Sequence, residues 1–301
     1  MSLTTILLVL LSAFIHAGWN LFSKLQHPSA SFFLIASLSG ALLLSPALFL
    51  YGRSILPDVP ARIWGFLLAS GFFLALYYIS LAGAYRAGDM SIAYPLARSS
   101  PVIVVTIVTV LLGRGDQVSA LCVAGIMLVV GGCFLIPLKR LGDFHLRNYF
   151  SVTCGLALLA AVGTSGYSIL DDEALRQLRA HVAIGKTPVT LVYACMEALS
   201  ASIWLLLFVT LRRSGRANLH RVLRSKTRNA VFAGGAIYFA YGLVLLSLAF
   251  AANVSCVVGF RQLSVPLGAI LGIVVLKEAP HGPKIAGVIV MFVGLILVAM
   301  G

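Results

Sequence analysis

Arg98 and Arg261 are the residues of this sequence that point most directly to chemistry. Each lies inside an apolar stretch long enough to cross a bilayer, one in each half of the chain. A guanidinium keeps its proton, and a charged side chain at membrane depth usually faces a protein interior or a watery cavity. Arginine also presents a planar fork that suits a carboxylate or a phosphate. The pair therefore predicts an anion-binding cavity, with the alternative that each arginine only holds helices together, through freed carbonyls or Glu197.

Prolines stand close to both arginines. Arg98 lies between Pro95 and Pro101, and Pro266 follows Arg261. Because proline has no backbone N–H, each one leaves the carbonyl four residues earlier without its helical partner. Irregular backbone of this kind is tolerated at membrane depth where it packs against protein or lines a cavity. We therefore expect an irregular helix beside each arginine.

Other polar side chains also fall inside apolar stretches. Glu197 is a candidate for proton coupling, with the alternative that it is the fixed partner of an arginine. His16, Asn20 and Lys24 recur one helical turn apart, next to Trp19, and give one polar face. His16 could gate the cavity or relay protons, or it could simply bond to a neighbouring helix.

Tyrosines could line a cavity with rings that also offer hydroxyl groups, although tyrosine is common at membrane interfaces too. Tyr77, Tyr78, Tyr238 and Tyr241 have suitable positions. We assign proton coupling or gating to Glu197 and His16. The substrate-binding assignment comprises Arg98, Arg261, Trp19, Asn20, Tyr78, Tyr94 and Tyr241.

Signatures of catalysis and of bound cofactors are missing from the sequence. It contains no phosphate-binding Gly-rich loop with Lys, no HExxH, no GxSxG and no acidic cluster for a metal. Its five cysteines show no CxxC or Cys/His spacing, which favours the interpretation that they are small apolar residues. We expect a protein that is not an enzyme, needs no cofactor and uses an ion gradient or the substrate gradient.

The elements that position these residues are membrane helices. Of the 301 residues 60% are hydrophobic and only 10% are charged, and the mean hydropathy of +1.02 is far from that of a soluble domain. The sequence predicts an all-α integral membrane protein with ten transmembrane helices, the first of which is retained because no signal-peptide cleavage site follows it. The predicted spans are 3–22, 30–51, 63–85, 91–112, 118–138, 149–170, 188–211, 229–250, 254–276 and 283–300.

The sequence contains an internal repeat. Ala84-Tyr85-Arg86-Ala87 aligns with Ala249-Phe250-Ala251-Ala252. Five spans per copy force the copies into opposite orientations, the inverted-repeat arrangement of many secondary transporters, which places the substrate site near the midplane. We predict two five-helix repeats, residues 1–138 and 149–301, joined by a linker at 139–148. Small residues suited to close helix packing recur in both copies, as Gly125, Gly132, Gly287 and Gly294.

The net charge of +13 comes mostly from loops next to the membrane, which favours anionic lipid headgroups over nucleic acid as the partner. Loop 212–228 alone carries seven basic residues. The positive-inside rule places this loop in the cytoplasm and both termini outside. For segment 171–187 we favour a plain connecting loop over a short interfacial helix that could gate the cavity.

Three motifs resemble the EamA-like branch of the drug/metabolite transporter superfamily, and the likeness extends over the whole chain. They are His16-Ala17-Gly18-Trp19-Asn20, Tyr94-Pro95-Leu96-Ala97-Arg98 and Arg261-Gln262-Leu263-Ser264-Val265. The resemblance implies ten helices in two inverted repeats, a central cavity and movement of metabolites, usually export, across a bacterial inner membrane. It also implies cytoplasmic termini, whereas the loop charges predict that both termini lie outside. Gln262 stands where relatives often carry an acidic residue, which leaves the role of that carboxylate open.

The leading hypothesis is a secondary active transporter, an exporter of small anionic or zwitterionic metabolites such as amino acids or organic acids. It would work by alternating access around a midplane cavity. A flippase for a lipid-linked metabolite, a membrane-embedded lipid-modifying enzyme and a sensor without turnover are the alternatives. The expected partners are the metabolite and membrane lipids, without nucleic acid. The sequence does not define the identity of the substrate, the direction of transport or the coupling ion. It also leaves open whether the protein forms a homodimer.

Overall fold

A computed structural model describes residues 2–26, 28–87, 97, 101–105, 107–108, 110–114, 119–135, 138, 140, 142, 152–182, 184–251, 254–275 and 280–300. Within these residues the chain is helical, and no strand occurs. In the part of the chain that the structure describes, six helices are long and apolar enough to cross a membrane. They are α1 (Leu3–Gln26), α2 (Ala30–Ile55), α3 (Ala61–Ala87), α6 (Val152–His181), α7 (Lys186–Leu211) and α9 (Thr227–Ser247).

Shorter elements complete the described chain. Two apolar helices, α5 (Ala120–Leu135) and α12 (Gly282–Met300), belong to predicted spans. A third predicted span, 254–276, is divided into α10 (Val254–Phe260), the 3-10 turn η6 (Arg261–Leu263) and α11 (Ser264–Val275). The remaining elements are η1 (Leu56–Asp58), the π-helical turn η2 (Val110–Arg114) and α8 (Arg213–Ser225).

The predicted spans coincide closely with nine of these helical regions, and half of the predicted span 91–112 lies outside the described residues. Two loop predictions were wrong. Segment 171–187 begins inside α6, which continues to His181, because apolar positions such as Ala174, Leu175 and Leu178 are buried along one face. Most of the predicted loop 212–228 forms α8.

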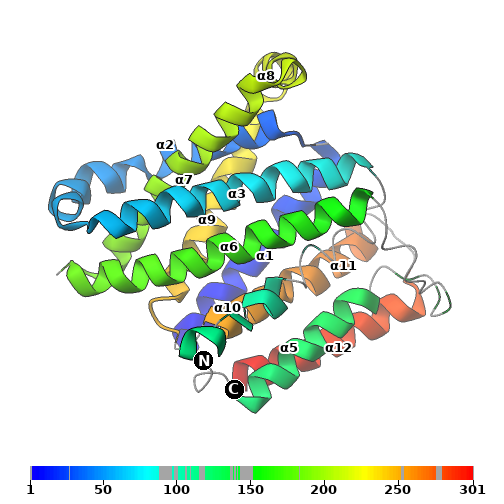
Figure 1. Cartoon of the computed structure of the whole chain (residues 1–301). Helices are drawn as coiled ribbons and strands as arrows, with labels where there is room; N and C mark the ends of the chain where they lie inside the picture. Colours follow the sequence, from blue (N-terminus) through cyan, green and yellow to red (C-terminus); the bar gives the residue numbers. More distant parts are fainter. Residues whose placement is uncertain are drawn as a thin grey trace.

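The helices pack in pairs that join the two halves of the sequence (Figure 1). Helix α3 lies on α6 and α7, while α1 lies on α9 and α2 on both α7 and α9. Helix α5 runs beside α12. The N-terminal end of α1 and the C-terminal end of α12 lie at the same end of the molecule. Each half therefore buries its apolar surface largely against the other half.

Glycines set the distance between α5 and α12. A Cβ added to Gly125 would lie 2.5 Å from the carbonyl oxygen of Gly294, and one added to Gly132 would lie 2.7 Å from that of Gly287. Backbone atoms cannot retreat as a flexible side chain can, so a residue larger than glycine would force the helices apart. These contacts confirm the small-residue packing predicted for the four glycines.

Two cysteines depart from the interpretation given to all five. Cys122 of α5 and Cys256 of α10 form a disulfide, with their Cα atoms 6.4 Å apart. Sequence spacing could not indicate this pair, because the residues are 134 positions apart and meet only when α10 packs on α5. Cys133, Cys154 and Cys195 are buried and take no part in this disulfide, as the sequence suggests.

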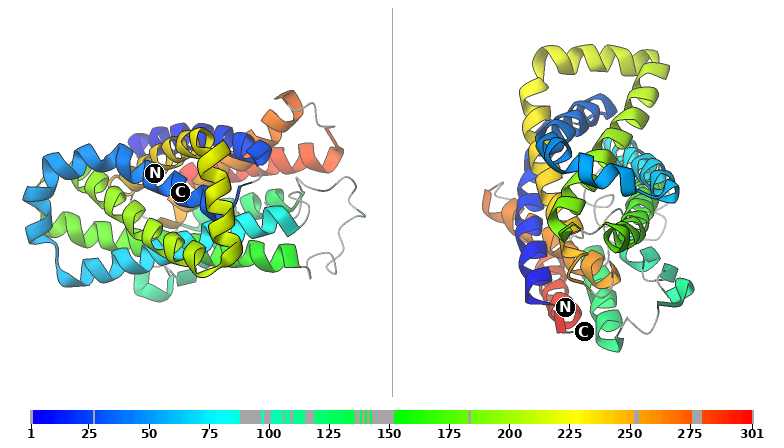
Figure 2. Two further views of the ribbon diagram at one scale, coloured as in Figure 1. Left: turned by 90° about the horizontal axis from the view of Figure 1, so that it is seen from above. Right: turned by 90° about the vertical axis from the view of Figure 1, so that its left-hand side faces the viewer.

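Helix α8 crosses one end of the molecule between α7 and α9 (Figure 2). Its apolar side chains Leu219 and Val222 pack against the core. Arg213, Arg216, Arg221 and Arg224 are exposed, as are Arg212 and Arg228 at either side. The helix thus has one buried apolar edge and a strongly basic outer face.

Candidate functional site

A small internal cavity lies where α1, α3, α6, α9 and η6 meet. The space that the centres of water molecules can occupy in it is about 30 Å³, which is enough for one or two waters. Polar and aromatic side chains from all five elements line it, among them His16, Trp19, Tyr77, Tyr78, Tyr167, Tyr241 and Arg261. The cavity is therefore a small space with amphipathic walls.

The break in the ninth predicted span brings Arg261 to this cavity. Helix α10 ends at Phe260, and Pro266 cannot donate to the carbonyl of Gln262. The backbone N–H of Ser264 donates instead to the carbonyls of Arg261 and Gln262, which tightens the chain into the 3-10 turn η6. The irregular helix predicted from Pro266 is confirmed.

The guanidinium of Arg261 is held by tyrosines. Its Nη2 atom donates to the Tyr167 hydroxyl over 2.9 Å. Its central carbon lies 6.0 Å from the ring centre of Tyr167 and 5.9 Å from that of Tyr241, within the range of cation–π attraction. Arg261 is only 4% exposed, and its Nη1 atom has no hydrogen-bond partner among the described residues. A buried charged donor without a partner is costly, so this atom is suited to receive an acceptor from a ligand.

Helix α1 contributes the predicted polar face. The indole Nε1 of Trp19 donates to Nδ1 of His16 over 3.1 Å, and the two rings meet edge to face. Asn20 lies one turn beyond His16 and donates to its carbonyl over 2.8 Å. His16 and Trp19 line the cavity, whereas Asn20 is not among its lining residues.

A second, smaller cavity adjoins the first. Tyr241 and Arg261 line both, and Asp171 lines the second. Asp171 is fully buried on α6, where its Oδ1 accepts from the hydroxyl of Tyr193 over 2.7 Å and from that of Ser70 over 2.5 Å. Its Oδ2 accepts a hydrogen bond from the Tyr241 hydroxyl. Three hydroxyl groups from three helices therefore converge on one carboxyl group.

Glu197 belongs to the same cluster. It is fully buried on α7, and its Oε1 lies 3.2 Å from the Ser70 hydroxyl oxygen. Gly71 makes this approach possible, since a Cβ there would lie 2.8 Å from the backbone nitrogen of Ala201. The close contact of α3 and α7 places Ser70 between the carboxyl groups of Asp171 and Glu197.

The predicted site residues have three different outcomes. Trp19, Tyr78, Tyr241, Arg261 and His16 lie together around the first cavity. Asn20 and Glu197 do not line it, and Glu197 forms no ion pair with Arg261 or any other described residue. Arg98 and Tyr94 lie outside the described residues.

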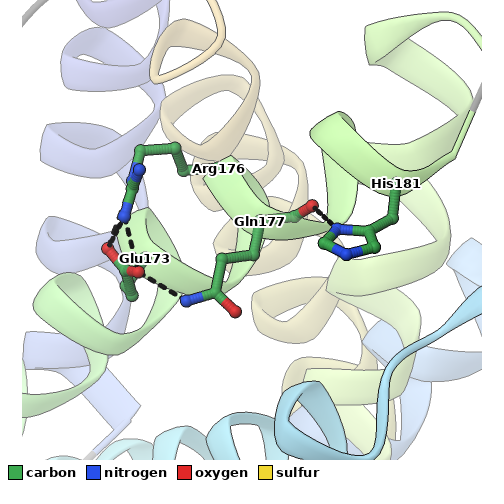
Figure 3. A network of polar contacts seen from close by, with 4 residues as sticks. All are labelled: Glu173, Arg176, Gln177 and His181. Carbon is green, nitrogen blue, oxygen red and sulfur yellow. Dashed lines mark hydrogen bonds and ion pairs between the residues drawn. The ribbon is translucent and has the colours of Figure 1, made fainter.

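Sequence reasoning missed Ser70, Asp171, Tyr167 and Tyr193. Asp171 was assigned to a connecting segment, although it stands one turn after Tyr167 and its helical face continues at Ala174 and Leu178. That periodicity was the available signal. A polar network does mark the outer end of α6, where Arg176 and Gln177 bind Glu173 and His181 contacts the carbonyl of Gln177 (Figure 3).

Comparisons with known proteins agree with this description. Residues 3–138 match the EamA-like transporter family. The resemblance to EamA transporters stated from the motifs is thereby confirmed over that region. The EamA match and the apolar helices identify a multi-pass membrane protein, and EamA is a family of transporters.

A solved structure extends the likeness in fold to the whole chain. A crystal structure, titled simply as that of a protein, superimposes with a TM-score of 0.71 over 100% of this chain and 98% of that one. The two sequences are 17% identical, so the comparison concerns fold alone. No curated protein matches this sequence.

Proposed function

We propose that this protein is a secondary active transporter that moves small anionic or zwitterionic metabolites, such as amino acids or organic acids, out across a bacterial inner membrane. Ten spans would form two inverted repeats, 1–138 and 149–301, linked by 139–148. The substrate would occupy the cavity around Arg261, with Trp19 and the tyrosines forming its walls. The halves would rock about this cavity to expose it alternately on each side.

The observation that carries this proposal is the Nη1 atom of Arg261, which has no hydrogen-bond partner among the described residues. This atom is buried and charged, and Arg261 lines a cavity that otherwise offers aromatic rings and hydroxyl groups. A carboxylate would supply the missing acceptor, and a charge-assisted hydrogen bond of this kind is among the stronger ones in proteins. A neutral apolar ligand would leave the donor unsatisfied.

The pattern of helix contacts supports two related halves. Exchanging the halves maps α1, α2, α3 and α5 onto α6, α7, α9 and α12. The contact of α1 with α9 then becomes that of α6 with α3, and the contact of α2 with α9 becomes that of α7 with α3. The contacts of α2 with α7 and of α5 with α12 map onto themselves. A pseudo-two-fold arrangement of the halves predicts that the set of helix contacts is unchanged by this exchange.

Matching residues on α3 and α9 support the same relation. Gly71 lies against Ser200 of α7, and Gly234 lies against Ser39 of α2. About two turns after each glycine comes a cavity tyrosine, Tyr78 on α3 and Tyr241 on α9. The two halves therefore offer equivalent rings to one cavity.

The size of the cavity supports a closed state. A space for one or two waters is too small for an amino acid, so α1, α3, α6 and α9 must separate to admit a substrate. Transporters use such helix movements to open one side at a time.

Uptake into proteoliposomes tests the transport proposal. Radiolabelled amino acids, organic acids, neutral sugars and cationic amines would be offered to the purified full chain. We expect accumulation of acidic or zwitterionic compounds and its loss in Arg261→Ala. The matched control is Arg176→Ala, because Arg176 sits on the outer end of α6 in an ion pair with Glu173. Uptake of cations alone, or full activity in Arg261→Ala, would contradict the proposal.

A further inference from the structure

The cluster of Ser70, Asp171 and Glu197 has a shortage of hydrogen-bond donors. Ser70 carries a single hydroxyl hydrogen, yet its oxygen lies 2.5 Å from Asp171 Oδ1 and 3.2 Å from Glu197 Oε1. The shorter distance assigns that hydrogen to Asp171. Glu197 Oε1 then faces lone pairs of the Ser70 oxygen, which an ionised carboxylate could only repel.

The surroundings of Glu197 offer an ionised carboxylate little compensation. Both carboxyl groups are fully buried, and neither forms an ion pair with a described residue. Glu197 Oε2 receives no hydrogen bond from the part of the chain that the structure describes. A buried carboxylate without donors is strongly disfavoured relative to the neutral acid.

We infer that Asp171, Ser70 and Glu197 form a proton-binding site in which Glu197 holds the proton and donates it to Ser70, while Asp171 is the ionised partner. With this assignment every contact joins a donor to an acceptor: Glu197 donates to Ser70 across the 3.2 Å contact, and Ser70, Tyr193 and Tyr241 donate to Asp171. The ligand of this site is a proton, and its holders come from α3, α6 and α7.

One neighbouring residue, Tyr241, contacts this site and also lines the first cavity. Titratable and charged side chains act on the two carboxyl groups from α3, α7, α9 and η6, and these are Tyr78, Tyr193, Tyr238, Tyr241 and Arg261. Asp171 and Arg261 both line the small cavity, and Arg261 Nη1 has no hydrogen-bond partner among the described residues. Tyr241 lines both cavities and bonds to Asp171.

Proton movement through the cluster balances without another reactant. The Glu197 proton passes to the Ser70 oxygen while the Ser70 hydroxyl proton passes to Asp171 Oδ1. One O–H bond breaks and one forms at each transfer, so Glu197 becomes ionised and Asp171 neutral. Asp171 then passes a proton to the Tyr241 oxygen while the Tyr241 hydroxyl proton passes to water in the small cavity that both residues line. Coupling of this release to substrate movement rests on the proposed transport function, whereas the presence of the proton does not.

Infrared spectroscopy of the purified full chain in lipid tests the site without a substrate. A protonated buried carboxyl group gives a C=O stretching band that an ionised one lacks. We expect this band at neutral pH, its loss in Glu197→Gln, and its retention in the control Glu173→Gln. In Ser70→Ala the band should persist at higher frequency, because the acid loses its hydrogen-bond acceptor. Absence of the band from the parent protein, or its persistence in Glu197→Gln, overturns the inference.

Hydrogen–deuterium exchange of the same band tests the path. We expect Tyr241→Phe to slow exchange several-fold. Tyr193→Phe is the matched control, because it removes a hydroxyl from the same carboxyl group but does not line either cavity. Equal exchange rates in the parent and Tyr241→Phe would overturn the path through Tyr241. A missing band would leave the transport proposal standing, and failed transport would leave the proton assignment standing.

Discussion

The Nη2 atom of Arg261 lies 2.9 Å from the hydroxyl of Tyr167, and this contact joins the second half's broken helix to α6. It fixes the guanidinium so that Nη1 is left for another acceptor. The orientation depends on residues far apart in sequence, which meet only in the folded chain.

Replacement of Tyr167 by Phe should weaken ligand binding without abolishing it. The variant loses one hydrogen bond to a charged donor, worth about 1.5–3 kcal/mol, but keeps the ring beside the guanidinium. We expect a weaker apparent affinity for the substrate in a binding titration, with Arg261→Ala weaker still. Equal affinities of Tyr167→Phe and the parent protein would show that this contact does not orient Arg261 for binding.

Gly125→Ala should destabilise the protein, because the new methyl group would meet backbone atoms of α12 at 2.5 and 2.7 Å. Overpacking of this kind costs about 1–3 kcal/mol. Gly131→Ala on the same helix is the control, since a Cβ there meets nothing within 4 Å. Thermal unfolding in detergent should give a lower midpoint for Gly125→Ala alone. A lower midpoint for both variants would point to helix-wide effects rather than to the contact with α12.

Asp171→Ala should also lower stability, because it leaves the hydroxyl groups of Ser70, Tyr193 and Tyr241 without their buried acceptor. An unsatisfied buried group costs about 1–3 kcal/mol. Asp58→Ala, at an exposed position in η1, should unfold at the midpoint of the parent protein. If the two variants behave alike in thermal unfolding, the carboxyl group does not hold the cluster together.

We expect the basic face of α8 to bind anionic lipid headgroups. Arg213, Arg221 and Arg224 are exposed on a helix that crosses one end of the molecule. Juxtamembrane basic residues are attracted to negative surface potential, and salt weakens this attraction. Replacement of all three by Gln should reduce the thermal stabilisation given by phosphatidylglycerol over phosphatidylcholine.

The control for α8 replaces the same number of arginines elsewhere. Arg53, Arg62 and Arg176 are exposed on α2, α3 and α6. Their replacement by Gln should leave the preference for phosphatidylglycerol largely intact. An equal loss in both variants would mean that overall charge, rather than α8, attracts the lipid.

Hydropathy predicted most of the helices closely, because the length of an apolar run is fixed by the bilayer it crosses. It failed where polar residues continue a helix. Asp171 and Arg176 look like the start of a loop, yet α6 runs through them, since Leu175 and Leu178 still pack inward. The amphipathic α8 was missed because the seven basic residues of segment 212–228 made it look like a loop, despite the apolar positions within it.

The site was only partly predictable. Arg261 and Pro266 signalled a charged side chain beside an irregular helix, and both features are present. The cluster around Asp171 depends on which faces of α3, α6 and α7 meet, and the glycines that decide this have no chemical signature of their own. Pairwise spacing within one segment cannot reveal contacts such as that of Ser70 with Asp171, 101 residues apart.

Thermal unfolding of the purified protein against acidic, zwitterionic, neutral and cationic metabolites tests the central claim most directly. A ligand that binds only the folded state raises the midpoint by an amount set by its concentration relative to its dissociation constant. We predict that acidic or zwitterionic compounds raise the midpoint of the parent protein and that Arg261→Ala loses this response while still unfolding cooperatively. Stabilisation by cations or lipids alone, or an unchanged response in Arg261→Ala, would contradict the claim that Arg261 receives the substrate.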